Sequence, residues 1–192
     1  MGIKVIQLLL SKQKLKRSFF LFVVIFACCF FSGCGFKQPS ASDIPTELRV
    51  LYIDSLNPYS LLTIQLSRML TSLNVHITRT EKTAPLILRI FDTRLSYDIP
   101  PITYSGNAAS YNYTLTTSFE LVMRNGKRIL GPNELSVSQS LLQNTNQVYA
   151  PNATTLMKRE LTPLLVTAIY NQLANQQIRA LLRKTFARKQ IK

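Results

Sequence analysis

The clearest pattern in the chain is an alternation that suits a half-buried β-strand. From Tyr111 to Met123 the odd positions are Tyr, Tyr, Leu, Thr, Phe, Leu and Met, while the even positions up to Arg124 are Asn, Thr, Thr, Ser, Glu, Val and Arg. Successive side chains of a strand point to opposite faces, so this stretch predicts a strand with one buried face, as in an antiparallel sheet. Asn125-Gly126 follows at once and is a strong signal for a hairpin turn.

The flanking sequence supplies partners for this strand. Apolar or alternating runs predict further strands over residues 48–53, 75–78, 86–99 and 134–142. In the last of these, Ser136, Ser138 and Ser140 are expected to point outward.

Two helices are expected to cover one face of this sheet. Asn57-Pro58 predicts the start of the first, with asparagine as N-cap and proline at the first helical position, and Asn74 suits a left-handed stop. The second begins at Asn152 or Thr154 and continues toward Arg183; its apolar stripe consists of Leu161, Leu165, Ile169 and Leu173. The order of elements predicts an α+β fold, a two-layer sandwich of a small, mostly antiparallel sheet with two helices on one face.

Residues 1–33 have the composition of a secretory signal peptide. Basic residues from Lys4 to Arg17 precede an apolar run of thirteen residues from Phe19 to Phe31. A helix of that length rises only about 20 Å, which is too short for a hydrocarbon core of about 30 Å. We therefore set this segment aside before considering the fold.

Ser32-Gly33-Cys34, at the end of this segment, resembles a bacterial lipobox, in which cleavage precedes a lipid-modified cysteine. Cys34 is thus the expected lipid attachment site, although Phe31 stands where leucine is usual. A conventional cut near Gly33, or a single-pass anchor, is the alternative. Gly35 follows Cys34, where lipoproteins retained in the inner membrane typically have aspartate. This favours a location at the periplasmic face of the cell outer membrane. Residues 34–46, with Pro39 and Pro45, are expected to form a lipidated tether.

The composition of the chain after residue 33 excludes several classes of function. It keeps one cysteine and one histidine, and its net charge is +9, because five of the 23 basic residues and none of the nine acidic ones precede residue 34. Six of those positive charges lie between Arg179 and Lys192, and we expect residues 184–192 to form a basic tail. A basic end without a basic face argues against nucleic-acid binding.

The sequence offers no set of residues for catalysis. His76 is the sole imidazole and lies within an expected strand, with no cysteine near it. The phosphate-binding, G-x-S-x-G and H-E-x-x-H motifs do not occur. We therefore predict no enzymatic activity, no cofactor and no metal site.

The region of the alternating strand is instead suited to an interface. Between Thr103 and Asn146, 19 of 44 residues are Ser, Thr, Asn or Gln and only five are charged. Interface cores are depleted in charged residues, whereas a solvated surface usually is not. The candidate interface residues are Tyr104, Tyr111, Tyr113, Thr116 and Ser118. A plain polar sheet face is the alternative explanation.

Two segments resemble the lipopolysaccharide-assembly lipoprotein E family (LptE). They are Cys34-Gly35-Phe36-Lys37 and the stretch from Ile44 to Val75, IPTELRVLYIDSLNPYSLLTIQLSRMLTSLNV, and the later order of loop, strand, hairpin and closing helix is similar as well. The resemblance implies two helices on a small sheet over residues 47–183. It also implies a plug inside the outer-membrane β-barrel LptD that assists assembly of that barrel and insertion of lipopolysaccharide.

Some members of this family contact lipopolysaccharide through basic residues near a loop that here runs Tyr104-Ser105-Gly106-Asn107 and has no cation. The clustered cations of this region are Arg124, Lys127 and Arg128, which are candidates for lipopolysaccharide binding because guanidinium can bind phosphate with two hydrogen bonds. Simple solvation of a hairpin tip is the alternative. An auxiliary lipoprotein that binds lipid for another envelope transporter is the second hypothesis for the function.

Overall fold

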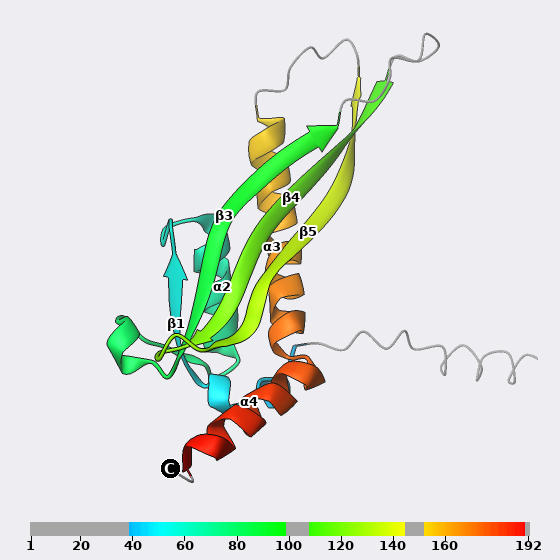
Figure 1. Ribbon diagram of the computed structural model, residues 1–192. Helices are drawn as coiled ribbons and strands as arrows, with labels where there is room; N and C mark the ends of the chain where they lie inside the picture. Colours follow the sequence, from blue (N-terminus) through cyan, green and yellow to red (C-terminus); the bar gives the residue numbers. More distant parts are fainter. Residues whose placement is uncertain (1–38, 99–107, 145–151, 191–192) are drawn as a thin grey trace, which may run out of the picture. The chain divides into compact units, whose positions relative to one another are not determined.

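The computed structural model describes residues 39–98, 108–144 and 152–190, which contain one five-stranded sheet (Figure 1). The order across the sheet is β2-β1-β3-β4-β5. The strands are β1 (Val50–Ser55), β2 (His76–Ile77), β3 (Leu86–Asp98), β4 (Ala108–Met123) and β5 (Arg128–Asn144). β1 runs parallel to both of its neighbours, and β3, β4 and β5 are antiparallel to one another. The sheet is thus mixed but mostly antiparallel, and the predicted α+β class is confirmed.

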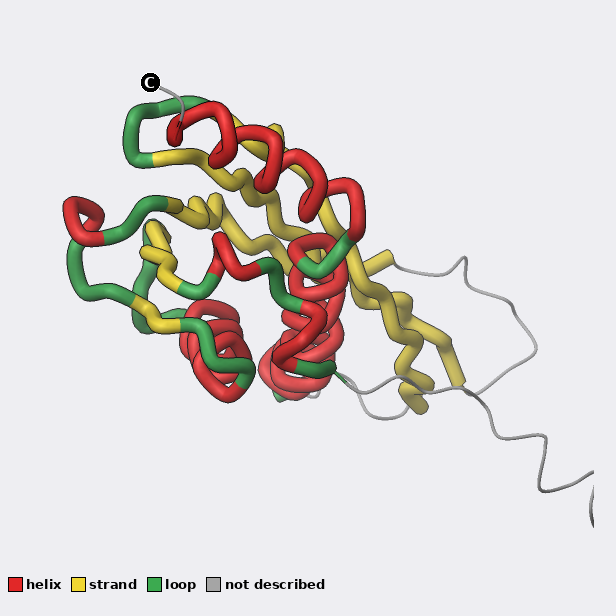
Figure 2. The backbone as a smooth tube through the Cα atoms, turned by 90° about the horizontal axis from the view of Figure 1, so that it is seen from below, coloured by secondary structure: helices red, strands yellow, loops and turns green. Residues whose placement is uncertain are grey.

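Helices α2 (Leu61–Ser72) and α3 (Ala153–Leu173) lie side by side on one face of the sheet (Figure 2). Leu66 of α2 and Leu161, Leu165 and Ile169 of α3 have no solvent exposure. They pack in one apolar cluster with the inward side chains of β1, β3 and β4. Burying one large aliphatic side chain contributes about 1.5–3 kcal/mol, so this layer is the main source of stability.

The alternation in β4 is confirmed residue by residue. Leu115, Phe119 and Leu121 are fully buried on the helix side, and Thr117 among them is 1% exposed. Thr114, Thr116 and Ser118 point to the other side and are half-buried between the flanking strands. β4 thus presents an apolar face to the helices and a hydroxyl-rich face to the outside.

The hairpin after β4 forms where predicted, but with a three-residue loop. The Gly126 N–H donates to the Met123 carbonyl at 2.8 Å, and the Met123 N–H donates to the Lys127 carbonyl at 2.8 Å. Gly126 has φ +81°, whereas Asn125 keeps a negative φ. This is the hairpin type in which an ordinary turn is followed by a left-handed glycine, so glycine is the residue that the loop requires.

Register shifts interrupt β3 and β5. β3 gains one residue between Ile90 and Thr93 relative to β4. β5 shifts twice relative to β4, first between Arg128 and Leu130 and then between Leu130 and Asn133. Pro132 lies within the second shift, where its missing N–H costs no ladder hydrogen bond. Beyond these shifts the apolar residues still face the helices, with Leu95 opposite Leu115 and Leu115 opposite Val137.

The first helix begins later than predicted. Ser60, not Asn57, is its N-cap, and the Ser60 Oγ accepts from the Thr63 N–H at 3.2 Å. The Asn57 Oδ1 instead accepts from the Tyr59 N–H at 3.1 Å, so Asn57-Pro58 forms a turn that leads into the helix. The predicted left-handed stop at Asn74 is confirmed by its φ of 62°.

The last helix is divided in two, which the sequence analysis did not anticipate. After α3 the chain breaks at Ala174 and Asn175, and α4 then runs from Gln176 to Gln190. The Asn175 Oδ1 accepts from the Gln177 N–H at 2.9 Å and thereby caps α4. Ile178 and Leu182 are buried and Phe186 packs against the core. Residues 184–190 therefore continue helix α4, in the part of the chain where a basic tail was expected.

The start of α3 also differs in detail from the expectation. The helix begins directly after Asn152, one of the two predicted caps, but the Asn152 side chain makes no capping hydrogen bond. The Leu156 N–H donates to the Asn152 carbonyl at 2.8 Å, so the first turn closes through the backbone.

Candidate interaction surface

The face of the sheet opposite α2 and α3 is open and carries short hydroxyl side chains; we call it the open face. Ser136, Ser138 and Ser140 of β5 are exposed on it, as predicted. They lie opposite Thr116, Thr114 and Asn112 of β4, and the Thr114 Oγ1 and Ser138 Oγ are 2.8 Å apart. The candidate residues Thr116 and Ser118 lie together in this array, flanked by Arg94 opposite Thr116 and Glu134 opposite Ser118.

The three candidate tyrosines do not lie together on this face. Tyr113 is 4% exposed within the core, and its ring centroid lies 5.6 Å from that of Tyr97. Tyr111 is half-buried and packs against the same core, and Tyr104 lies outside the described residues. Tyr113 is therefore not available to a partner. The alternation already implied this, because Tyr113 is an odd, inward position of β4.

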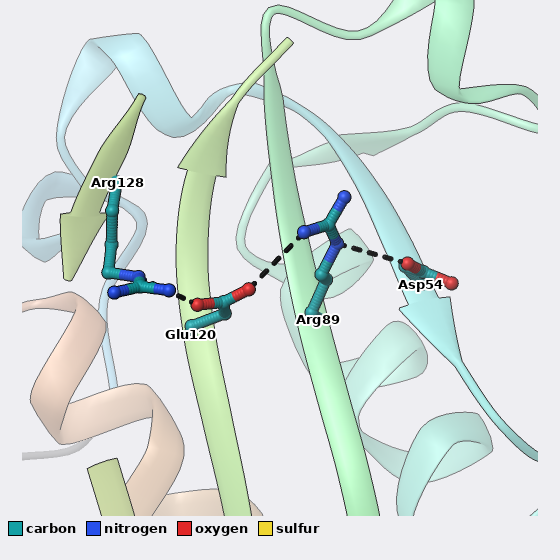
Figure 3. Close-up of polar contacts among 4 residues, drawn as sticks. All are labelled: Asp54, Arg89, Glu120 and Arg128. Carbon is teal, nitrogen blue, oxygen red and sulfur yellow. Dashed lines mark hydrogen bonds and ion pairs between the residues drawn. The ribbon is translucent and has the colours of Figure 1, made fainter. Parts of the chain in front are cut away.

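Four charged residues form a line across the sheet, which we call the charge ladder (Figure 3). The Arg89 Nε lies 3.3 Å from Asp54 Oδ2, and the Arg89 Nη1 lies 3.3 Å from Glu120 Oε1. On its other side Glu120 accepts from the Arg128 Nε at 2.9 Å. The ladder links β1, β3, β4 and β5, with one charge from each strand.

Glu120 is the centre of the ladder and its most buried member. Its side chain is 6% exposed, against 40% for Arg89 and 59% for Arg128. A buried carboxylate is tolerated when charged donors satisfy it, and here a guanidinium approaches each oxygen. This role of Glu120 was not predicted from the sequence. The signal for it in the sequence was that Glu120 is an acidic residue at an outward position of a strand that is otherwise neutral.

The ladder and a nearby backbone contact engage two of the three candidate hairpin cations. Arg128 binds Glu120, and the Arg124 Nη1 donates to the Lys82 carbonyl at 2.9 Å. Lys127 is exposed at the tip of the hairpin. The three residues are thus neighbours in the chain but differ in how freely they can bind a ligand.

A hollow of about 230 Å³ separates the start of β5 from α4. It is lined by Lys127, Arg128, Ile129, Leu181, Lys184 and Thr185. Lys184 is a cation that the sequence analysis did not group with the hairpin, because the α3–α4 break that brings it there was not foreseen. The lining has three cations, two aliphatic side chains and no acidic residue.

Within residues 39–98, 108–144 and 152–190, no group of three or more His, Cys, Asp or Glu side chains is placed to hold a metal ion. No helix in the same part of the chain combines the length and the apolar composition needed to cross a membrane.

The fold and the open face define a class, small α+β domains whose mixed sheet is covered by helices on one side. A minor lipoprotein from Acinetobacter baumannii has this fold, with a TM-score of 0.55 and 20% identity over 66% of the present chain and 91% of its own. The chain itself belongs to the LptE family, described as lipopolysaccharide-assembly, whose model matches residues 48–189.

Two relatives agree with this assignment. The LPS-assembly lipoprotein LptE of Photorhabdus laumondii is 27% identical over 122 residues, which are 64% of this chain and 66% of that protein. The protein of the same name from Pectobacterium atrosepticum is 26% identical over 88% of this chain and 87% of its own length. The family predicted from the sequence is thereby confirmed.

The charge ladder leads to a prediction about stability. Glu120→Gln should lower the free energy of unfolding by about 1–3 kcal/mol, because it leaves two guanidinium groups without their shared counter-charge. Asp54→Asn removes a pair in which both side chains are 40–50% exposed, so it should cost at most about 1 kcal/mol. Urea unfolding of the two variants measures the difference. Equal losses would show that burial of Glu120 does not set the strength of the ladder.

Proposed function

We propose that this protein is an outer-membrane lipoprotein that plugs the LptD β-barrel, assists its assembly and takes part in the insertion of lipopolysaccharide into the outer leaflet. It acts by binding and not by catalysis. Membership of the LptE family supports the general role. The open face is the observation on which the plug depends.

The open face has the chemistry that a barrel lumen would accept. The lumen of a large outer-membrane barrel is polar, so a plug must offer hydrogen-bonding groups without many charges to desolvate. Thr114, Thr116, Ser118, Ser136 and Ser138 provide hydroxyl groups that both donate and accept. Their short side chains also lose little rotamer freedom on contact.

Charged substitutions on the open face should weaken barrel association without unfolding the domain. Thr116→Glu would lie opposite Arg94, and Ser118→Arg would lie opposite Glu134, so each new charge has a cross-strand partner in the free protein. Against a barrel wall, these pairs must lose water, at a cost of several kcal/mol. Co-purification in detergent with a single large barrel measures the effect.

Thr71→Glu and Thr155→Arg are the matched controls, because both residues are exposed on the helix side. They should co-purify with the barrel at the wild-type yield. If the open-face variants do the same, the plug surface lies elsewhere. If the wild type itself brings down no barrel, the alternative of an auxiliary lipoprotein for another envelope transporter is favoured.

The lipid anchor belongs to the same proposal. Several acyl chains on Cys34 would hold the protein firmly, since a single chain binds a membrane only marginally. We expect the intact mass of the mature protein to correspond to a chain that begins at residue 34 and carries acyl groups. A chain that begins elsewhere, with an unmodified thiol, contradicts the anchor.

We further propose that the hollow beside the hairpin contacts lipopolysaccharide. Lys127 and Lys184 face a space that also has Ile129 and Leu181, so phosphate and acyl groups could both be accommodated. Lys127→Glu should reduce the lipopolysaccharide retained per purified complex and leave barrel yield unchanged. Arg79→Glu, an exposed charge reversal outside the hollow, is the control. If both variants retain equal amounts of lipopolysaccharide, the cations of the hairpin are simply solvated and the proposal is contradicted.

A further inference from the structure

Helix α4 is strongly basic, and Lys184 is the one cation of this helix that the lipopolysaccharide proposal uses. The helix contains five cations and no acidic residue: Arg179, Arg183, Lys184, Arg188 and Lys189. Ile178 and Leu182 fix its apolar side in the core. Arg183 is consequently held outward, on the solvent side of a packed helix and not on a free tail.

The beginning of the described chain is attached to the base of this helix. The Arg179 Nη2 donates to the Ser42 carbonyl at 3.2 Å and to the Asp43 carbonyl at 2.9 Å. The Tyr170 hydroxyl, at the end of α3, donates to Asp43 Oδ2 at 3.3 Å and accepts from the Ser40 N–H at 3.3 Å. Residues 40–43 are thus held at the junction of α3 and α4 by one side chain from each helix.

This attachment limits how far α4 can lie from the lipid anchor. Ser42 lies eight positions after Cys34, so the connection spans at most about 29 Å when fully extended. From Arg179 to Arg188 the helix rises about 14 Å. If Cys34 is acylated, Arg179 lies within about 29 Å of the lipid anchor and Arg188 within about 43 Å.

We infer that the outer face of α4 lies against an anionic phospholipid surface. The inference rests on the lipid anchor proposed above, because the anchor brings this face into range. A helix that carries several cations and no acidic residue suits a diffuse layer of phosphate groups. Since the apolar side is committed to the core, the contact is electrostatic and does not require insertion. It orients the domain relative to the bilayer, which a tether alone does not.

Energy transfer on vesicles tests this orientation. The acylated protein with Ala187→Cys carries a donor dye on an exposed position of α4, and a head-group-labelled lipid in the vesicle is the acceptor. Transfer should be higher on phosphatidylglycerol vesicles than on phosphatidylcholine vesicles, and high salt should abolish the difference because it shortens the screening length. Neither vesicle contains lipopolysaccharide or a barrel.

Neutral substitutions identify the face that is responsible. Each cation near a charged surface contributes roughly a fivefold factor in binding, so Arg183→Gln with Lys184→Gln should weaken the contact about 25-fold. Arg68→Gln with Arg79→Gln removes the same charge from exposed sites outside α4 and should leave transfer unchanged. Lys127→Gln tests whether the hollow is responsible instead of the outer face of α4. It should leave energy transfer nearly unchanged.

The outcomes separate the inference from the proposal beneath it. Protein that does not float with neutral vesicles lacks an anchor, and this overturns both the anchor and the reach argument. Protein that floats with both vesicles but shows equal transfer overturns the inference alone. An equal loss in the Arg68 and Arg79 control, or a full loss in the Lys127 variant, would also overturn it.

Discussion

The rest of the structure depends on the packing of α3 against the inward face of β4 and its neighbours. Leu161, Leu165 and Ile169 have no solvent exposure, and neither do Leu115 and Phe119 of β4. Because side chains alternate along a strand, committing one set to this contact sends the other set to the opposite face. The open face is therefore not an independent feature. It consists of the even positions that remain once the odd positions from Tyr113 to Met123 are buried in the core.

The charge ladder has a different role, because it crosses the strands on the side that the helices do not cover. Ile87 and Val122, a cross-strand pair on that side, are 1% and 3% exposed, so this end of the open face is partly closed. Glu120 lies beside them and joins Arg89 to Arg128. A buried ion pair is weak evidence for stability but constrains register, since a slipped strand would leave the carboxylate without donors. The hydroxyl-rich part of the face begins beyond this closed end.

The sequence predicted elements well where one local pattern determined the outcome. The alternation of β4, the glycine of the hairpin and the left-handed Asn74 are of this kind, since each depends on the residue itself or on strict periodicity. The start of α2 was misplaced because Asn57-Pro58 suits a turn as well as a cap, and the hydroxyl of Ser60 decided between them. Tyr113 has an amphipathic ring that suits an interface, but its odd position in β4 places it in the core.

The break between α3 and α4 was the most consequential omission. Asn175 is a weak signal within a helical sequence, and it acts as a cap only because Ile178 and Leu182 can reach the core after the chain turns. No local pattern reveals that Lys184 then approaches Lys127 across a hollow, or that Arg179 meets residues 42 and 43. These contacts join parts of the chain more than fifty residues apart. The candidate site was therefore only partly visible in the sequence.

The contacts of α4 also place several proposed features at one end of the sheet. The hollow lies between the hairpin and α4, and residues 40–43 are bound to α4. β3 ends at Asp98 at the opposite end of the sheet, where it pairs with the first part of β4. β3 has 13 residues, which correspond to about 43 Å of strand. The apolar band of an outer-membrane barrel is about 25 Å tall. β3, β4 and β5 run from the α4 end to the opposite end of the sheet (Figure 1). Under the proposed plug function, strands of this length are long enough to cross that band with the open face along the barrel wall.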